Sequence, residues 1–472
     1  MNATINPYAT ITELGTLLRE KKITSVQLTR FYLDRLERFG PKLNAVVTMT
    51  RELAEAQAKQ ADKDIAAGSW HGPLHGIPYG VKDLLATKGI PTTWGAAPYR
   101  NQVFEYDATV IERLTRGGAV LCAKLAMVEL AGGFGYDEAN ASFTGPGRSP
   151  WNTEFWSGGS SSGPGAAVGA GLVPFAIGSE TSGSILTPSA FSGVTGFRPT
   201  YGMVSRHGAM ALSWTLDKLG PLARTAEDCA LIMAEIAGRD PADPTTVEAQ
   251  IEWLGPFRAT HSESDGRTVA IPKGCTEKVQ KEVRENFEKS VGVLKQAGYR
   301  FVEIEFPDFP YGAISPIVDA EGASAFEDLL TSGKAKELTA PQDRIGGYEA
   351  AATLAIDYLR AMRIRTRIRQ AMLQLFEDVD LIAAPTRASV AYPIAKKFDQ
   401  VYPDVRSGVA LIPAMNLAGA PAISLPNGLG ENGLPTAIQF NAAPLHDVMA
   451  IEAGKALQRV TDFHRQKPPA FS

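Results

Sequence analysis

The sequence is poor in cysteine. It has three cysteines in 472 residues, and Cys122, Cys229 and Cys275 lie far apart, without the spacing of metal ligands. This scarcity argues against a disulfide-stabilised secreted domain and against a zinc site, and it fits a reducing compartment in which the thiols are small buried residues. No motif indicates a metal or another cofactor, and we expect neither.

Long apolar runs and an excess of one charge are also absent. The longest weakly polar run, residues 163–178, is too short and too rich in glycine to cross a bilayer, and the N-terminus has no secretory apolar segment. The formal net charge is −4, which gives no reason to expect nucleic acid or a membrane as partner. We therefore expect a cytoplasmic protein, monomeric or homodimeric, that acts on a small molecule.

What the chain does have is an alternation of helical and strand patterns. Apolar spacing predicts a helix around residues 11–18 and a second from about residue 25. Residues 267–274, 276–298 and 299–307 are typical of a strand, an amphipathic helix and a strand. Strands interleaved with helices predict an α/β fold with one sheet covered on both faces.

One domain over residues 1–472 is the expected organisation. We expect N-terminal helices in 1–65, a core with the catalytic residues in 66–235, and the rest of the sheet with substrate-pocket loops in 236–472. The Gly/Pro-rich stretch 239–266 is the best candidate for a surface insertion, and the arginine-rich run 359–370 favours a solvated helix face over an RNA site.

Two clusters of serine and glycine stand out: WSGGSSSGPG at 156–165 and GSETSGSILTPSA at 178–190. A Gly/Ser linker is polar throughout, whereas these clusters bracket small and apolar residues that predict a tightly packed helix and a strand. The serines therefore lie at the ends of packed elements, where loops are held rigidly and chemistry tends to occur.

A serine nucleophile needs a group that takes its proton, and histidine is scarce. None of the six histidines lies in either cluster, which leaves lysine open as the base, and no Ser-x-x-Lys occurs. The pattern Gly-x-Ser-x-Gly at 159–163 offers Ser161 as the nucleophile of a Ser–His–Asp hydrolase, although Ser-rich glycine loops match this pattern easily. The residues alone leave both alternatives open.

Several longer patterns, taken in order, resemble the amidase signature family. They are HGIPYGVKDLLATKGIPTTWG, DATVIERLTRGGAVLCAKLAM, SGGSSSG, GSETSGSI, GVTGFRPTYGMVSRHG, LDKLGPLARTAEDCA and NLAGAPAISLPNGLGENGLP. The resemblance covers most of the chain and implies the family's fold, a single large α/β domain with a central mixed β-sheet flanked by helices. It also implies a Ser–cisSer–Lys triad, which falls on Ser184, Ser160 and Lys82.

The resemblance assigns a role to each of these residues. Ser184 is the nucleophile, Ser160, at a cis peptide bond, passes its proton on, and Lys82 accepts it. This requires a neutral Lys82, and burial among apolar neighbours would lower the pKa of its ammonium. The backbone N–H groups of the turn at 181–184, including those of Thr181, Ser182 and Gly183, are implied as the oxyanion hole.

The sequence also departs from the family. Leu186 stands where the family usually has an arginine, so the acid–arginine pair of this loop cannot form in the usual way, and we expect Glu180 to use a hydroxyl or backbone donor. Met127 is a candidate either for the core or for contact with the acyl group.

The substrate class rests on one further position. The glutamine-hydrolysing A-type subunit of tRNA-dependent amidotransferases sets an acid where Val409 lies here, so we favour a stand-alone amidase for small, rather apolar amides, with aryl amides, esters or carbamates as further candidates. The alternatives are that A-type subunit, the Ser161 hydrolase, and an inactive relative that serves as a binding protein.

Overall fold

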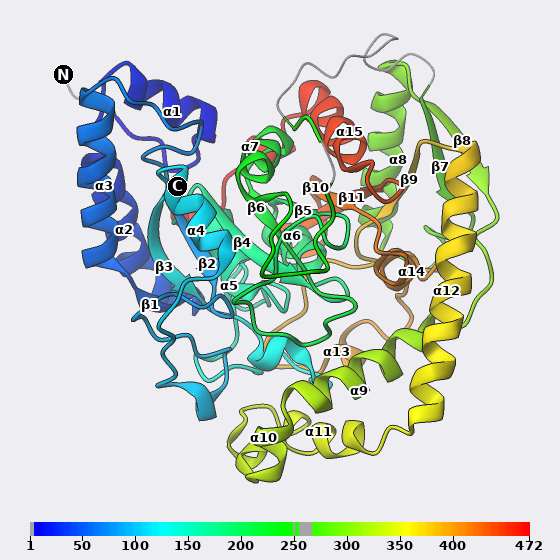
Figure 1. Cartoon of the computed structure of the whole chain (residues 1–472). Coiled ribbons are helices and arrows are strands. Elements are labelled where there is room, and N and C mark those ends of the chain that lie inside the picture. The colour runs from blue at the N-terminus through cyan, green and yellow to red at the C-terminus, as the bar shows by residue number, and fades with distance from the viewer. Residues whose placement is uncertain (1–3, 249–250, 254–266) are drawn as a thin grey trace.

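The computed structural model describes residues 4–248, 251–253 and 267–472. Its described residues form one α/β domain around a single mixed sheet of eleven strands, in the order β1-β3-β2-β4-β6-β5-β10-β11-β9-β7-β8 (Figure 1). The strands are β1 Val46–Met49, β2 Pro78–Lys82, β3 Val120–Leu125, β4 Phe175–Glu180, β5 Thr195–Arg198, β6 Lys218–Ala223, β7 Thr268–Pro272, β8 Arg300–Ile304, β9 Leu381–Pro385, β10 Ala422–Leu429 and β11 Pro435–Asn441. The predicted fold class is confirmed.

Helices surround this sheet, and the N-terminal ones (blue) lie at the opposite end of the molecule from α12 (yellow) in Figure 1. The α-helices are α1 Ile11–Arg19, α2 Ser25–Leu43, α3 Arg51–Ala66, α4 Thr109–Arg116, α5 Ser162–Gly169, α6 Leu186–Ser192, α7 Ala226–Ile236, α8 Lys281–Gln296, α9 Ile314–Ala325, α10 Glu327–Thr331, α11 Asp343–Ala351, α12 Ala355–Asp378, α13 Phe398–Val401, α14 Leu411–Ala418 and α15 Asp447–Val460. Short 3-10 turns include η2 Glu129–Gly132 and η4 Lys334–Glu337. No helix in the described part of the chain is long and apolar enough to cross a membrane.

The N-terminal helices begin where local chemistry favours a start. Thr10 and Thr24 each cap a helix, and a Glu or Gln three residues later completes a capping box in both cases. The predicted start of α2 near residue 25 is confirmed. The segment 1–65 also supplies strand β1, which pairs antiparallel with β3 and which the helical spacing did not predict.

The predicted strand–helix–strand unit is confirmed. Strands β7 and β8 are parallel neighbours, and α8 connects them. Helix α8 buries Val283, Phe287 and Leu294 on one side, as its apolar spacing predicted. This unit forms one edge of the sheet, whereas the serine clusters lie near its middle.

The serine clusters are not linkers, because the elements between and after them are buried throughout. Every residue of α5, β4 and α6 is buried. Gly163 shows how closely α5 approaches its neighbours: a Cβ there would lie 2.4 Å from the backbone N of Ala126. The two clusters are also joined directly, since the Ser161 N–H donates to the Ser184 carbonyl at 3.2 Å.

The stretch 239–266 was expected to be a surface insertion, and the run 359–370 was expected to be a solvated helix face. Most of 239–266 lies outside the described residues, but in its described part the Asp240 carboxylate accepts hydrogen bonds from the Thr109 and Ser205 hydroxyls at 2.6 and 2.5 Å, which ties this part to the domain. The arginine-rich run 359–370 lies in α12. Most arginines of this run are exposed, as predicted. Arg365 is half-buried instead and donates to backbone carbonyls.

Candidate active site

Lys82 and Ser160 meet at one end of the central strands. Strands β2 and β4 are parallel neighbours, so Lys82, the last residue of β2, lies beside Ser179 near the end of β4. The Lys82 Nζ donates to Ser160 Oγ at 2.7 Å and to Ser179 Oγ at 2.9 Å. All three side chains are buried, so this cluster of one amine and two hydroxyls is shielded from water.

The environment of Lys82 favours its neutral form. Its neighbours Tyr79, Val81 and Leu84 are buried, as the sequence suggested. Burial lowers the pKa of Lys82 to about 7, although the negative charges of Asp217 and Glu180 partly oppose the shift. A substantial fraction of Lys82 can therefore accept a proton at neutral pH, which an exposed lysine cannot do.

Asp83 does not neutralise Lys82, although it follows it in the chain. Its carboxylate forms a buried ion pair with Lys124 at 3.1 Å and accepts hydrogen bonds from the Thr93 N–H and hydroxyl. Lys82 is thus not a surface lysine paired with Asp83, because Lys82 is fully buried and Asp83 has another partner.

Ser160 stands at the first serine cluster with a distinctive backbone. The peptide bond between Gly159 and Ser160 is cis, as the resemblance implied. The Ser160 carbonyl accepts a hydrogen bond from the Val128 N–H at 3.0 Å, which fixes this loop against the segment after β3.

The loop that carries Ser184 is held by a buried carboxylate. Glu180 Oε2 accepts hydrogen bonds from the backbone N–H groups of Ile185 and Leu186 at 2.9 and 3.0 Å. This confirms the expected backbone donors. These two hydrogen bonds hold residues 181–184 in a tight turn. Gly183 in this turn has a φ of +85°, a backbone angle that favours glycine.

An arginine also binds Glu180, and the sequence did not reveal it. Arg198, at the end of β5, donates to Glu180 Oε1 at 2.9 Å, and the Asn416 amide of α14 donates to the same oxygen at 2.9 Å. Burial alone would favour the protonated acid, but Arg198 and the hydrogen bonds lower the pKa of Glu180 to about 2. The loop therefore has its acid–arginine pair despite Leu186, supplied from a different strand.

The turn exposes a row of backbone donors. None of the N–H groups of Thr181, Ser182, Gly183 and Ser184 donates to an acceptor in the described ranges of the chain. Successive free N–H groups on a tight turn can stabilise an oxygen anion in front of Ser184. This is the geometry that the resemblance implied for an oxyanion hole.

Ser184 opens onto a cavity of about 340 Å³, here called the Ser184 cavity. Four aromatic side chains line it: Tyr136, Trp156, Tyr392 and Phe398. The Ser184 hydroxyl has no hydrogen-bond partner in the described part of the chain. The structure thus contains the Lys82–Ser160 link of the expected relay but not the Ser160–Ser184 link, and catalytic hydrogen bonds of this kind often tighten only around substrate.

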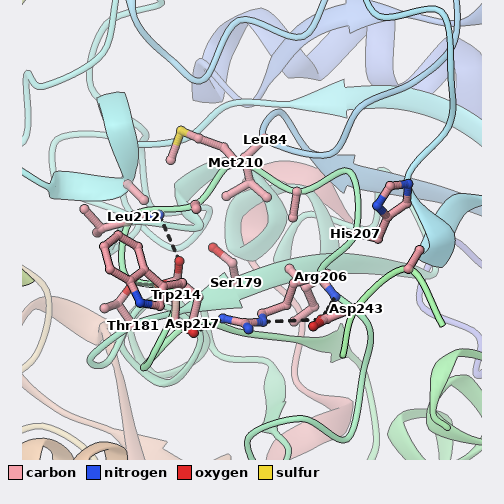
Figure 2. Close-up of a pocket in the computed structure, with 15 residues that line it drawn as sticks. Leu84, Ser179, Thr181, Arg206, His207, Met210, Leu212, Trp214, Asp217 and Asp243 are labelled. Atoms are coloured by element: carbon pink, nitrogen blue, oxygen red, sulfur yellow. Dashed lines mark hydrogen bonds and ion pairs between the residues drawn. The ribbon is translucent and has the colours of Figure 1, made fainter. Parts of the chain in front are cut away.

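A second cavity of about 200 Å³, the Ser179 cavity, adjoins the first, because both are lined by Ala131, Thr181 and Leu212. Figure 2 shows Ser179, Thr181 and Asp217 at its wall. Asp217 accepts hydrogen bonds from the Thr181 hydroxyl at 2.6 Å and from the Leu212 N–H at 2.9 Å. Asp217 therefore anchors the start of the Ser184 turn, on the side where Ser179 binds Lys82.

Ser161 does not have the environment of a nucleophile. It is fully buried, and its hydroxyl donates to the Ser179 carbonyl at 3.2 Å and accepts from the Ser179 N–H at 3.3 Å. No described histidine contacts it; His261 lies outside the described residues. This disfavours the Ser161–histidine alternative.

Two expectations stay predictions: that Met127 contacts the acyl group, and that the protein binds no metal. The Met127 side chain is fully buried in the core and does not line the Ser184 cavity, so nothing here supports contact with substrate. Among the described residues, Asp64, His71 and His75 place potential metal-ligand atoms within 4.8 Å of one another. They do not line the Ser184 cavity.

Besides Arg198 and Asn416, the sequence did not reveal Ser179, Asp217 and Arg387, of which Arg387 lines the Ser184 cavity. Ser179 lies inside the quoted second cluster, five residues before Ser184, and the alternation of side chains along β4 was the available signal. Asp217 and Arg387 are distant in sequence from both clusters and had no local signal.

Comparison with known proteins gives consistent results. The family model Amidase matches residues 27–451. The A-type subunit of the glutamyl-tRNA(Gln) amidotransferase of Methylococcus capsulatus is 36% identical, over 98% of this chain and 99% of that protein.

Solved structures with the same fold include two related enzymes. The peptide amidase of Stenotrophomonas maltophilia is 30% identical, with a TM-score of 0.85 over 99% of both chains. The A-type subunit of the glutamyl-tRNA(Gln) amidotransferase of Thermotoga maritima is 28% identical, with a TM-score of 0.81 over 97% of this chain and 96% of that one. The sequence patterns, the sheet and these matches agree: this chain belongs to the amidase signature family, whose members hydrolyse C–N bonds of amides.

Proposed function

We propose that this protein is a stand-alone amidase that forms an acyl-enzyme on Ser184, with Ser160 and Lys82 as the proton relay. The observation that carries the proposal is Lys82, a fully buried lysine with a pKa near 7 that donates to Ser160 at 2.7 Å. A buried amine of this kind can act as a base at neutral pH.

The reaction follows from this arrangement. As Ser184 Oγ attacks the amide carbonyl, its proton moves to Ser160 Oγ, and the Ser160 proton moves to Lys82 Nζ. The carbonyl oxygen gains negative charge and accepts hydrogen bonds from the backbone N–H groups of Thr181, Ser182 and Gly183. Losing one donor of this type typically costs about 2.7–4 kcal/mol of transition-state stabilisation.

The second half of the reaction returns the proton. When the tetrahedral intermediate collapses, Lys82 and Ser160 pass the proton to the leaving nitrogen, which departs as a neutral amine or ammonia. A water molecule then attacks the acyl-enzyme, with the same relay accepting its proton. Ser184 is regenerated and the acid is released.

The cavity walls favour small carboxamides with an apolar part. Tyr136, Trp156, Tyr392 and Phe398 form aromatic walls beside Ser184. Aryl amides, esters and carbamates also fit such walls. Val409 lies in a neighbouring cavity and offers no charge to a substrate ammonium.

The A-type subunit of a tRNA-dependent amidotransferase is the second candidate. The 36% identity to the Methylococcus capsulatus protein of that type favours it, and Val409 speaks against it. Glutamine hydrolysis that depends on a co-purifying partner would establish this alternative. We otherwise expect a monomer or homodimer in the cytoplasm, and the three free buried cysteines are consistent with a reducing compartment.

Labelling with a small fluorophosphonate tests the proposal, with intact mass and peptide mapping as the readout. We expect one adduct, on Ser184, and no adduct in Ser184→Ala. An adduct on Ser161 would overturn the relay. No adduct on folded protein would contradict an active stand-alone enzyme and favour the inactive binding relative or a missing partner.

A further inference from the structure

Arg387 has an unusual environment. It follows β9 in a loop, is half-buried, and lines the Ser184 cavity. Its guanidinium lies 6.0 Å from the centre of the Phe191 ring, yet in the described part of the chain it forms no hydrogen bond and no ion pair.

Other half-buried arginines of this protein use their guanidinium groups in hydrogen bonds. Arg35, Arg113 and Arg365 all donate to backbone carbonyls through their guanidinium groups. A guanidinium has five N–H donors, and those of Arg387 have no protein acceptor in the described part of the chain. The donors of Arg387 are therefore available to a group that enters the cavity.

The cavity offers Arg387 no negative charge. Among the described residues that line the Ser184 cavity, Arg387 is the only charged one. A neighbouring cavity of about 240 Å³, the Arg406 cavity, shares Arg387 and Tyr392 with it. In the part of the chain that the structure describes, its only charged lining residues are Arg387 and Arg406. The two cavities together form a cationic space, and no described residue of their walls is an acid.

Two acids in the same region, Asp137 and Asp343, do not form an ion pair with Arg387. Asp137 forms an ion pair with Lys397 at 2.6 Å. Burial, together with the nearby charge of Glu129, raises the pKa of the Asp343 carboxyl and so favours its neutral form. Neither supplies Arg387 with a counter-ion.

We propose that Arg387 binds a carboxylate carried by the substrate, so that the enzyme acts on amides with an anionic end. This inference rests on the proposed amidase function and narrows its substrate class. The planar guanidinium matches a carboxylate through two parallel hydrogen bonds. The aromatic walls accommodate the apolar part between the carboxylate and the scissile amide.

Paired substrates test this directly. Succinamate carries its carboxylate on the acyl side, and 4-methylpentanamide is its neutral near-isostere. N-acetylglycine carries it on the leaving amine, with N-isobutylacetamide as the neutral counterpart. For each pair the measured quantity is the ratio of kcat/KM, anionic over neutral, and we expect a ratio of about 10–100 in at least one pair, mainly through KM.

Variants connect the preference to Arg387. Arg387→Gln should bring the ratio close to one, and Arg387→Lys should retain part of it, because a lysine keeps the charge without the paired donors. Arg360→Gln is the matched control, since Arg360 is an exposed arginine of α12 paired with Asp357, and it should behave as wild type. A wild-type ratio near one in both pairs, or an unchanged ratio in Arg387→Gln, would overturn the inference.

Binding separates this inference from the proposed function. Calorimetry with Ser184→Ala protein should show succinamate or N-acetylglycine binding that is at least tenfold weaker when Arg387→Gln is added. Equal binding with and without Arg387 would overturn the inference even if neutral amides are hydrolysed. If the wild-type protein forms no fluorophosphonate adduct and hydrolyses no amide, but the two anionic compounds still bind in a way that depends on Arg387, then the Arg387 inference holds and the amidase function fails.

Discussion

Lys82 and Lys124 are two fully buried lysines on neighbouring parallel strands, one register position apart. Lys82 donates to two hydroxyls, those of Ser160 and Ser179. Lys124 instead forms an ion pair with Asp83 and donates to the Thr92 hydroxyl at 2.6 Å. The two lysines are equally buried, but the amine of Lys82 has only hydroxyl partners and the amine of Lys124 has a carboxylate partner.

The difference shows that the partner, and not burial alone, decides what a buried lysine does. Burial lowers the pKa of both amines, but a carboxylate in direct contact opposes the shift for Lys124. Among the described residues no carboxylate forms an ion pair with Lys82, and burial lowers the pKa of its amine to about 7. We infer that Lys124 supports the fold and that Lys82 supports the chemistry.

Replacing Lys82 should give the largest effect on turnover. Lys82→Met is expected to lower kcat/KM for amide hydrolysis by about a thousandfold, because Lys82 is the only described residue whose side chain forms a hydrogen bond with the Ser160 hydroxyl and can take its proton. Stability to urea should be equal to or above that of wild type, since the variant removes a buried amine that has no acid partner. A wild-type rate in folded Lys82→Met would contradict the relay.

Replacing Lys124 should affect stability instead. Lys124→Met leaves the Asp83 carboxylate buried without its cation, which we expect to cost about 3–5 kcal/mol of unfolding free energy. Urea unfolding measures this cost. Adding Asp83→Asn should recover part of it. Unchanged stability in Lys124→Met would show that the ion pair does not hold the fold.

The pH dependence of the wild-type rate sharpens the comparison. The protonated form of Lys82 cannot accept the relay proton, so kcat/KM should rise about tenfold per pH unit below pH 7 and level off above it. In Lys82→Met, the remaining kcat/KM should not rise in this way between low pH and pH 7. A rate that falls steadily above pH 7 in folded protein would contradict the proposed base.

Ser179 should have the smallest effect. Ser179→Ala removes the second acceptor of the Lys82 amine but leaves Ser160 in place, so we expect kcat/KM to fall by about 2- to 10-fold, the value of one hydrogen bond. Ser162→Ala is a control, because its hydroxyl donates to the Ala126 carbonyl instead. A thousandfold loss in Ser179→Ala would place Ser179 in the relay itself.

Much of this site could be predicted from the chain because its residues lie in contiguous motifs. Lys82 ends a strand segment, and Ser160 and Ser184 stand in two short clusters that only packed elements could bracket. Glu180 was recognised as needing another partner, and a backbone donor could be anticipated because Ile185 and Leu186 lie only five and six residues after it.

The rest depends on long-range contacts that no local pattern encodes. Arg198 and Asn416 reach Glu180 from positions 18 and 236 residues away. Ser179 contacts Lys82 only because β2 and β4 are neighbours. That Arg387 has no hydrogen bond or ion pair in the described part of the chain is visible only once its surroundings are known. Strand β1 was missed because its four residues follow a helix with much stronger periodicity.

The most direct test of the account is the titration of the Lys82 amine itself. Protein labelled with ¹³C at lysine Cε can be followed by NMR from pH 5.5 to 11, with the Lys82 signal assigned by its loss in Lys82→Met. The account predicts a midpoint near pH 7. A midpoint near 10.5, the ordinary value for lysine, would mean that Lys82 is charged during turnover and cannot be the base.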